Sequence, residues 1–251
     1  MLEIKDLEFS HQKSKVINNL SANFEKGKLY CIIGPNGCGK TTLVKLVSGL
    51  LPIHRGEIIL DGKKRDEYSQ KEFAQKISLL PQEKSIPEMT VEQLVLLGRY
   101  PYLGLLKSET KSDRKAVDLA LKTAGIEMFR SRMLSTLSGG ERQSAYLAML
   151  LAQDTPFILL DEPSVFLDVS NELALMKLLK DLAKTGKCVI AVLHNIPLAL
   201  TFGDEILVME KGEIKAKSTP ESIVNEGIIK KVFGVDVNIC ETKGKKRYIV
   251  E

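Results

Sequence analysis

A glycine-rich segment set between two contrasting stretches constrains the fold of this chain more than any other feature of its sequence. The segment covers residues 34–41 and fits the pattern G-x-x-x-x-G-K-[ST]. It follows the apolar run 29–33 and precedes a stretch, residues 40–51, whose apolar side chains recur at helical spacing as far as Pro52. In a strand, glycine loop and helix of this kind, backbone N–H groups and the helix N-terminus face an anion. The sequence therefore predicts a phosphate-binding loop.

Different residues of this phosphate loop are expected to bind different parts of a nucleotide and its metal ion. Lys40 is expected to reach the β and γ phosphates of ATP, and the Thr41 hydroxyl is expected to ligate Mg²⁺, with Thr42 beside it. The candidate nucleotide contacts are Gly34, Pro35, Asn36, Gly37, Cys38, Gly39, Lys40, Thr41 and Thr42. Cys38 leaves two interpretations open: a small residue that fits the loop, or a thiol whose pKa is lowered by the helix N-terminus.

Two adjacent carboxylates follow a second apolar run. Residues 157–160 read Phe-Ile-Leu-Leu, and Asp161 and Glu162 come next. Because neighbouring side chains on a strand point to opposite faces, the two acids can have different tasks at the end of a buried strand. Asp161 is the candidate for Mg²⁺, and Glu162 is the candidate for the general base that polarises the attacking water. Taken alone, the pair is equally compatible with a strand end solvated by acids.

Alternating strand and helix patterns along the rest of the chain predict an α/β fold. The 251 residues have ordinary globular composition, with 44% hydrophobic and 27% charged residues. Strands are expected at 2–9, 29–33, 56–61, 77–80, 157–160 and 188–193, helices at 40–51, 113–124, 141–152 and 172–184, a hairpin at 206–210 and 213–217, and a loop at 10–15. Residues 90–97 begin a region richer in helix signals. This order predicts a parallel sheet covered on both faces, with a mostly helical insert between about residues 84 and 153.

Charge, cysteines and hydropathy argue against several other classes of protein. The net charge of +4 is spread along the chain, and the basic run 243–247 is either a solvated tail or a binding patch. The four cysteines lack C-x-x-C spacing, which fits reduced thiols in the cytoplasm better than disulfides or zinc. The first ten residues do not resemble a secretory signal. The longest apolar run, residues 146–152, is shorter than the roughly 20 residues that span a bilayer, so we expect any membrane part to come from another chain.

A second glycine-containing segment precedes the helix pattern at residues 141–152. It reads Leu-Ser-Gly-Gly-Glu and offers an anion the Ser138 hydroxyl, the amides of Gly139 and Gly140, and a helix N-terminus. One nucleotide does not need two such sites from one chain. The segment is similar to the signature of the ABC ATPase family. The chain resembles this family over essentially its whole length, because its motifs stand in the family's order and spacing.

The resemblance implies a dimer of two identical chains, in which the signature of one subunit closes over the ATP held by the phosphate loop of the other. It identifies Gln82 as the Q-loop glutamine, Asp168 as the end of the D-loop and His194 as the switch histidine. Gln82 is then expected to contact Mg²⁺ and report to a membrane partner, and His194 to hydrogen-bond the γ-phosphate. The implied catalytic residues are Glu162, His194 and Gln82, and the implied metal ligands are Thr41, Gln82 and Asp161.

The resemblance also implies an architecture, with two departures from the family pattern. A single ABC ATPase domain over residues 1–251 is expected to have a P-loop NTPase core (1–83 and 154–251), an N-terminal antiparallel β subdomain, and an inserted helical signature subdomain (84–153). The place of the aromatic residue that usually stacks on adenine is held by His11, with Phe9 two residues earlier as the alternative. Asn195 follows the switch histidine where Asp is common.

One subgroup of transporters matches in more detail. Residues 89–102 resemble the segment after the Q-loop in bacterial importers of iron–siderophores, haem and cobalamin, and residues 151–156 are similar to that subgroup too. The implied function is the ATPase motor of such an importer at the cytoplasmic face of the membrane. Its implied partners are transmembrane permease subunits and, indirectly, an extracytoplasmic substrate-binding protein, with no nucleic acid.

Three questions stay open at this point. The sequence Tyr-Pro-Tyr at residues 100–102 is either a contact with the membrane partner or a structural turn. The alternative functions are a soluble ABC ATPase that acts on nucleic acid or ribosomes, and a motor for an unrelated cargo. Proteins of the first kind usually carry long coiled coils or a second ATPase domain, and the sequence shows neither.

Overall fold

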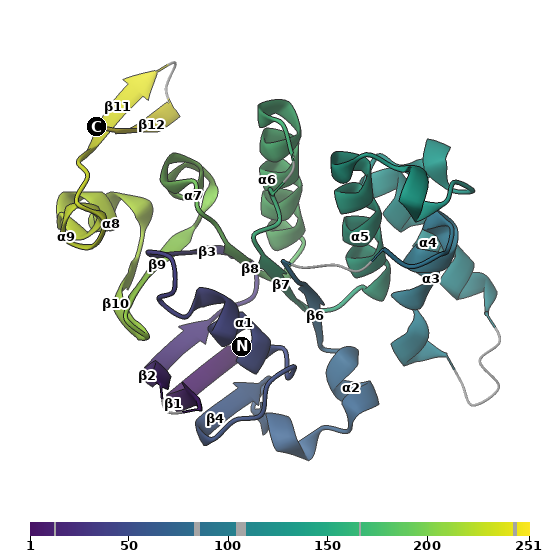
Figure 1. Ribbon diagram of the computed structural model, residues 1–251, viewed down its shortest axis with the longest axis horizontal. Helices are drawn as coiled ribbons and strands as arrows, with labels where there is room; N and C mark the ends of the chain where they lie inside the picture. Colours follow the sequence, from purple (N-terminus) through teal and green to yellow (C-terminus); the bar gives the residue numbers. More distant parts are fainter. Residues whose placement is uncertain (13, 83–85, 104–108, 166, 243–244) are drawn as a thin grey trace.

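A six-stranded sheet forms the centre of the computed structural model, which describes residues 1–12, 14–82, 86–103, 109–165, 167–242 and 245–251 (Figure 1). The strand order is β10-β9-β3-β8-β7-β6, and every neighbouring pair is parallel except the β9–β10 hairpin. The strands are β3 (Leu29–Ile33), β6 (Ile77–Leu80), β7 (Phe157–Asp161), β8 (Cys188–Val192), β9 (Glu205–Glu210) and β10 (Glu213–Ser218). All residues of β3, β7 and β8 are buried, as expected for parallel strands covered on both faces.

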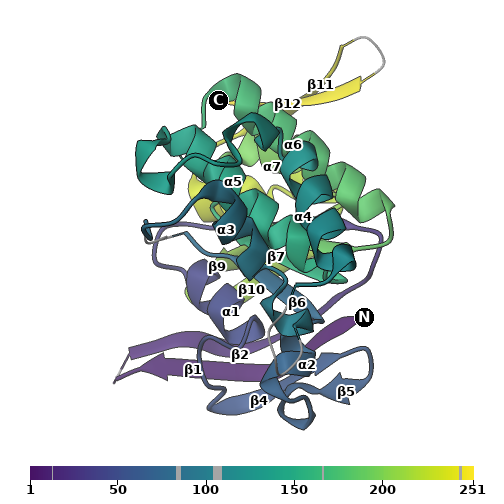
Figure 2. The ribbon, with the colours of Figure 1, turned by 90° about the vertical axis from the view of Figure 1, so that its right-hand side faces the viewer.

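A second, antiparallel sheet is built mainly from the N-terminal residues. Its order is β2-β1-β4-β5. The strands are β1 (Leu2–His11), β2 (Ser14–Phe24), β4 (Arg55–Leu60) and β5 (Lys63–Lys64). Helix α1 (Lys40–Val47) lies between the two sheets in both views (Figure 2), and its Leu43 and Leu46 share a core with Leu2 of β1 and Leu159 of β7. The predicted mostly parallel sheet and N-terminal antiparallel sheet are both confirmed.

Helices on the other face of the central sheet share one continuous core with it. These helices are α3 (Val91–Leu97), α4 (Lys111–Thr123), α5 (Gly139–Gln153), α6 (Val169–Lys184), α7 (Ile196–Phe202), α8 (Pro220–Asn225) and α9 (Ile228–Phe233). The short elements nearby are α2 (Gln70–Ala74), η1 (Arg65–Glu67), η2 (Tyr100–Tyr102), η3 (Glu127–Phe129) and η4 (Leu134–Thr136). Figure 1 shows α3, α4 and α5 grouped to one side of the sheet, beyond β6. The helical insert expected between residues 84 and 153 corresponds to this group, and its proposed boundary at residue 84 lies outside the described residues.

The chain closes with a hairpin that stands apart from both larger sheets. Strands β11 (Val237–Thr242) and β12 (Lys245–Val250) pair only with each other among the described residues. Tyr248 of β12 is buried in the core that also contains Leu198 and Leu200 of α7. This contact anchors the hairpin to the body of the protein.

Several element boundaries differ from the sequence expectation. The loop expected at residues 10–15 is wrong, because β1 continues to His11 and β2 begins at Ser14. Helix α1 ends at Val47 rather than residue 51, because Gly49 adopts a φ of 80° just beyond the C-cap Ser48. The hairpin expected at 206–210 and 213–217 is confirmed, and its turn places Lys211 and Gly212 at positive φ.

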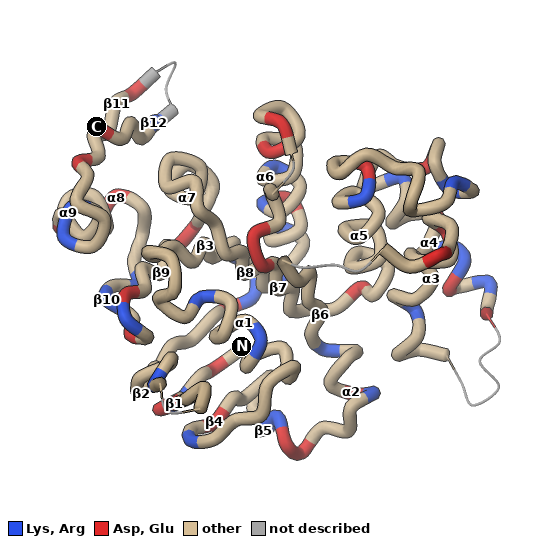
Figure 3. The backbone as a smooth tube through the Cα atoms, viewed as in Figure 1, with Lys and Arg blue, Asp and Glu red and all other residues tan. Residues whose placement is uncertain are grey.

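Charge and hydropathy are distributed as the sequence indicated. Figure 3 shows acidic and basic positions interspersed over both sheets and the helices. Within the described ranges, no helix combines the length and the apolar character needed to cross a membrane. The four cysteines, which all fall within these ranges, are free.

We expect Phe157→Ala to cost about 3–5 kcal/mol of unfolding free energy, because Phe157 opens β7 with no exposed surface and its removal leaves a cavity beneath α1. Urea denaturation measures this loss through the midpoint and slope of the transition. Leu119→Ala is the control, because Leu119 on α4 is 67% exposed and its truncation should change stability by only about 0.5 kcal/mol. Equal effects of the two substitutions would contradict the assigned core.

Candidate nucleotide site

The phosphate loop connects β3 to α1 and requires glycine for two different reasons. At Gly34 an added Cβ would lie 2.3 Å from the Met209 carbonyl oxygen, so only glycine allows β9 to approach. Gly39, the N-cap of α1, has a φ of 104°, a conformation that side chains disfavour. The loop therefore turns tightly from a buried strand into a helix, which leaves the N-terminus of α1 facing the space above the sheet.

Lys40 is the cationic centre of the loop. Its side chain is buried, and its Nζ donates to the carbonyl oxygens of Gly34 at 2.7 Å and Pro35 at 3.1 Å. These carbonyls are uncharged acceptors, so an incoming phosphate would offer the ammonium group a stronger, charge-assisted partner. The structure thus holds Lys40 within the loop where its role was predicted.

Cys38 is the residue for which one sequence interpretation is wrong. The thiol is buried at 4% exposure, and this burial raises the pKa of Cys38 above the usual value of a thiol, despite the nearby Lys40 charge. A lowered pKa is therefore excluded. Its Sγ would lie 2.6 Å from a Cβ at Gly34, so Cys38 fills the tight interior of the loop. The geometry therefore agrees with the other interpretation, in which Cys38 is a small residue that fits the phosphate loop.

The carboxyl end of β7 delivers its two acids to the same space. The Thr41 hydroxyl donates to Asp161 Oδ1 at 3.2 Å, so two of the residues expected to ligate Mg²⁺ are in direct contact. Asp161 is almost fully buried, and this burial raises the pKa of its carboxyl, with the neighbouring Glu162 charge acting in the same direction. Glu162 itself has a φ of 51°, and its amide donates to Val192 O of the adjacent β8 at 3.2 Å.

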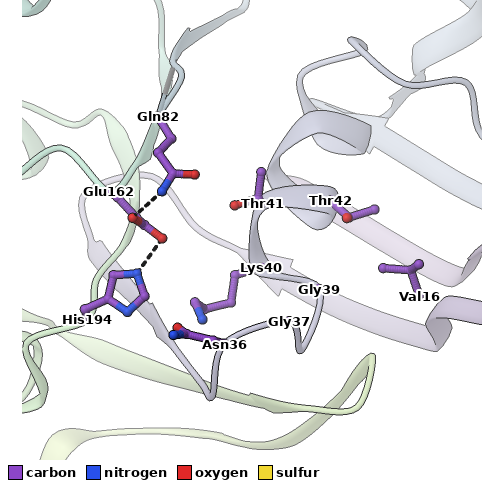
Figure 4. Close-up of a pocket in the computed structure, with 10 residues that line it drawn as sticks. All are labelled: Val16, Asn36, Gly37, Gly39, Lys40, Thr41, Thr42, Gln82, Glu162 and His194. Carbon is purple, nitrogen blue, oxygen red and sulfur yellow. Dashed lines mark hydrogen bonds and ion pairs between the residues drawn. The ribbon is translucent and has the colours of Figure 1, made fainter. Parts of the chain in front are cut away.

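The Glu162 carboxylate is held from two sides (Figure 4). Gln82 Nε2 donates to Oε2 at 2.6 Å, and His194 Nε2 lies 2.5 Å from Oε1. Gln82 follows β6 and His194 follows β8, the two strands that flank β7. The three residues implied by the family resemblance as the catalytic set are therefore in direct contact, although they are far apart in sequence.

A polar cavity of about 400 Å³ separates this trio from the phosphate loop. Its lining residues are Val16, Asn36, Gly37, Gly39, Lys40, Thr41, Thr42, Gln82, Glu162 and His194. Figure 4 shows Glu162 on one side and Lys40 and Thr41 on the other. The sequence analysis did not predict Val16 as a site residue. Val16 lies on β2, and no strand was predicted after the expected loop at 10–15. The cavity can accept a phosphate chain between a cationic loop and a candidate base.

Several predicted site residues do not line this cavity: Gly34, Pro35, Cys38, Asp161, His11, Ser138, Gly139 and Gly140. His11 is exposed at the end of β1, and Phe9 is buried and stacks on His54 with ring centroids 4.8 Å apart, so Phe9 is not available to adenine. The adenine contact of His11 stays a prediction. Ser138 caps α5, where its side chain accepts from the Glu141 amide, and Gly139 and Gly140 follow in the first turn.

The end of the D-loop also lies outside the cavity lining. Asp168 is the N-cap of α6 and accepts from the Asn171 amide at 2.8 Å. This hydrogen bond holds the pKa of Asp168 below its usual range. Phe166, within the predicted D-loop, lies outside the described residues.

The donor atoms at this site fit Mg²⁺. The hydroxyl of Thr41 and the carboxylate of Asp161 are hard oxygen ligands, and they already touch. Among the described residues, no group of three or more His, Cys, Asp and Glu side chains could enclose a metal on its own. Mg²⁺ characteristically takes one or two protein oxygens and completes its shell with substrate phosphates and water.

Comparison with known proteins agrees with this geometry. The family model described as ABC transporter matches residues 17–165. The chain is 38% identical over 237 residues to the achromobactin transport ATP-binding protein CbrD of Dickeya dadantii (strain 3937), covering 94% of this chain and 88% of that protein. It is also 38% identical over 239 residues to the ferric enterobactin transport ATP-binding protein FepC of Escherichia coli (strain K12), covering 94% and 88%.

A solved structure described as an inward-facing ABC transporter of metal-chelate type superimposes with a TM-score of 0.85 at 25% identity, over 100% of this chain and 97% of that chain. The chain belongs to the ABC transporter family, as one of its ATP-binding subunits. It is an ATPase, and the family, fold class and activity predicted from the sequence are confirmed.

We expect the pH dependence of stability to carry a contribution from Asp161. Because its folded pKa is raised, the protonated form is favoured in the fold, and its contribution is lost as the pH rises from the ordinary range of an aspartate through the raised pKa. Asp161→Asn keeps an acceptor for Thr41 and cannot titrate. Urea unfolding in EDTA measures the free energy of unfolding of the wild type and of Asp161→Asn at a series of pH values. As the pH rises through this range, the wild type should lose unfolding free energy relative to the variant. A difference that is flat with pH would contradict the buried carboxyl.

Proposed function

We propose that this chain is the ATP-hydrolysing motor of an importer for an iron complex such as a ferric siderophore. The observation that carries the motor assignment is the placement of Glu162 across one cavity from Lys40 and Thr41. The cargo class is supported by the relatives, which are named for transport of achromobactin and ferric enterobactin. Likeness to transport proteins over nearly the whole chain favours this function over action on nucleic acid or ribosomes.

Nucleotide binding begins with an exchange of partners at Lys40. The Nζ leaves the carbonyl oxygens of Gly34 and Pro35 for the β and γ phosphates of ATP, while loop amides and the N-terminus of α1 face the same anion. Thr41 and Asp161 are the residues that would hold Mg²⁺, which supplies charge neutralisation at the phosphates when bound. Mg²⁺ binding would be coupled to ionisation of Asp161, because burial raises the pKa of its carboxyl and a bound cation would lower it.

Glu162 is the proposed general base. It can polarise a water molecule only through a carboxylate oxygen, and both oxygens are engaged, one by Gln82 and one by His194. With ATP bound, Gln82 would be one of the residues that hold Mg²⁺ and His194 would hydrogen-bond the γ-phosphate, so both would release the Glu162 carboxylate for the attacking water. ATP binding thereby frees the Glu162 carboxylate to act as the general base.

A second copy of the chain completes the site. The Ser138 segment caps a 15-residue helix, so its amides and helix N-terminus suit a phosphate, yet it does not line the cavity of its own subunit. In the proposed dimer, Ser138, Gly139 and Gly140 of one subunit close over the ATP held by the other. Closure performs the power stroke, and hydrolysis reopens the dimer.

A groove of about 690 Å³ is the proposed seat of the permease. Leu50, Tyr68, Phe73, Ile77 and Met149 give it an apolar floor, and Leu50 is 63% exposed. The groove borders Pro81, one residue before Gln82, so its occupant would lie next to a member of the catalytic trio. In this proposal the permease in the groove can sense the nucleotide at the cytoplasmic face of the membrane, and a substrate-binding protein acts from the other side.

The Tyr-Pro-Tyr sequence has a structural role in this arrangement. Tyr102 donates from its hydroxyl to Gln153 O at 2.8 Å and packs under the Arg99 guanidinium, 3.9 Å from the ring centroid. Pro101 O accepts from Gln75 Nε2 at 2.7 Å. These bonds support the turn interpretation of residues 100–102.

We expect Glu162→Gln to bind ATP with wild-type affinity, to lower kcat by roughly 10²- to 10⁴-fold, and to remain dimeric with ATP. The substitution keeps the size of the side chain and removes its basicity. ATPase assays and size-exclusion chromatography measure the two effects. Glu127→Gln on exposed η3 is the matched control and should match the wild type. Normal turnover by Glu162→Gln would remove the residue from its proposed role.

We expect the tagged chain, extracted in detergent from its host's membranes, to retain a polytopic permease identified by mass spectrometry. Leu50→Glu should lose the permease, because it places a charge on the apolar floor of the groove, while ATP binding persists. Leu119→Glu is the control, since Leu119 is equally exposed but lies on α4 outside the groove. Recovery of only ribosomal or other soluble partners would overturn the importer function.

A further inference from the structure

The C-terminal turn of α5 is fastened by two side chains of residues 99–102 and by the side chain of its own last residue, Gln153. Arg99 Nη1 donates to Ala152 O at 2.7 Å, and Tyr102 Oη donates to Gln153 O at 2.8 Å. The Gln153 amide reaches outward, and its Nε2 donates to Ala74 O at 2.6 Å and Ile77 O at 3.2 Å. These contacts satisfy carbonyl groups that the end of a helix leaves without helical partners, and they connect α5 to α2 and to the start of β6.

The Arg99 contacts lie in a poorly solvated environment, whereas the bonds of Tyr102 and Gln153 are partly buried. Arg99 is 8% exposed, and its Nε donates to Asp113 Oδ1 at 3.0 Å, so its charge is paired within the protein. At Gly98 an added Cβ would lie 2.2 Å from Met149 O, so the end of α3 touches the backbone of α5 directly. Hydrogen bonds in such surroundings are strong and hold a fixed geometry.

The carbonyl groups that Gln153 grips belong to the wall of the permease groove. Ala74 and Ile77 line that groove, and so does Met149, one helical turn before Gln153 on α5. The opposite end of α5 carries Ser138 as its N-cap. Figure 1 shows α5 extending from the helical group toward β6 and α2. A helix of 15 residues is about 22 Å long and behaves as a stiff rod, so a tilt imposed at one end moves the other.

We propose that Gln153 is a positioning residue that links the occupant of the groove to the signature segment. Its two hydrogen bonds make α5 move together with the groove wall formed by α2 and β6. That wall in turn moves with the molecule that occupies the groove. Gln153 thereby sets the angle at which Ser138, Gly139 and Gly140 meet the ATP of the second subunit. This inference rests on the proposed function, because it takes the groove occupant to be the permease.

A spectroscopic experiment on the isolated chain tests the link without any permease. Spin labels at Leu119→Cys on α4 and Lys177→Cys on α6, both exposed positions, report the orientation of the helical group by double electron–electron resonance. Cys240→Ser removes the partly exposed native thiol, and the other three cysteines are buried. We expect Gln153→Met, which keeps the length of the side chain but removes both hydrogen bonds, to broaden the distance distribution between the labels.

Two further variants make the result decisive. Gln70→Met changes a glutamine of the same groove wall whose side chain makes no hydrogen bond to another described residue, and it should leave the distribution unchanged. If Gln153→Met fails to fold, Gln153→Asn, which keeps the amide but is one methylene too short to reach the carbonyl groups of Ala74 and Ile77, should broaden the distribution in its place. A distribution equal to that of the wild type would overturn the proposal.

The complex with the co-purified permease, reconstituted in liposomes, gives the functional readout. We expect Gln153→Met to lower the amount of ligand transported per ATP hydrolysed roughly tenfold, as for loss of a typical coupling free energy. Wild-type transport per ATP would overturn the proposal, because a merely stabilising residue would leave the ratio unchanged. Failure to recover any permease would count against the proposed function alone, since the spin-label distances still decide the role of Gln153.

Discussion

The hydrogen-bonded register of the parallel strands is the constraint on which the rest of the structure depends. The strands β6, β7, β8 and β3 are neighbours in that order, and each ends at the same edge of the sheet. Lys40 follows β3, Glu162 follows β7, and the adjacent strands β6 and β8 deliver Gln82 and His194 to either side of Glu162. Ligands bind at this edge in open α/β sheets for the same reason, because loops converge there from several strands.

The sequence predicted the parts of this arrangement that depend on local patterns. The fully apolar runs at β3, β7 and β8 identify buried parallel strands, and the phosphate loop and the Asp161–Glu162 pair follow two of those runs directly. Strand β2 was missed because it is irregular: Asn19 has a φ of 47°, and the pairing of β1 with β2 shifts register three times. Its Val16, which lines the cavity, was missed with it.

Tertiary contacts account for what local patterns could not predict. A helix N-terminus lowers a thiol pKa when the thiol is solvated, but burial dominates at Cys38, and burial depends on how Gly34 and β9 pack. The grip of Gln82 and His194 on Glu162, and that of Gln153 on Ala74 and Ile77, join residues separated by 32 to 80 positions. Such contacts have no signature at the spacing of a helix or a strand. The family resemblance supplied the first set of residues and was silent on the second.

The backbone of Glu162 has a consequence for how this protein balances stability against activity. Its φ of 51° is left-handed, a conformation that costs a residue with a Cβ roughly 1 kcal/mol and costs glycine nothing. The residue that would relax the end of β7 therefore differs from the residue that can activate water. Folding accepts this strain because the Val192 carbonyl and the two side chains around the carboxylate hold it in place. Under the proposed role of Glu162 as general base, glycine at this position would gain stability and lose turnover.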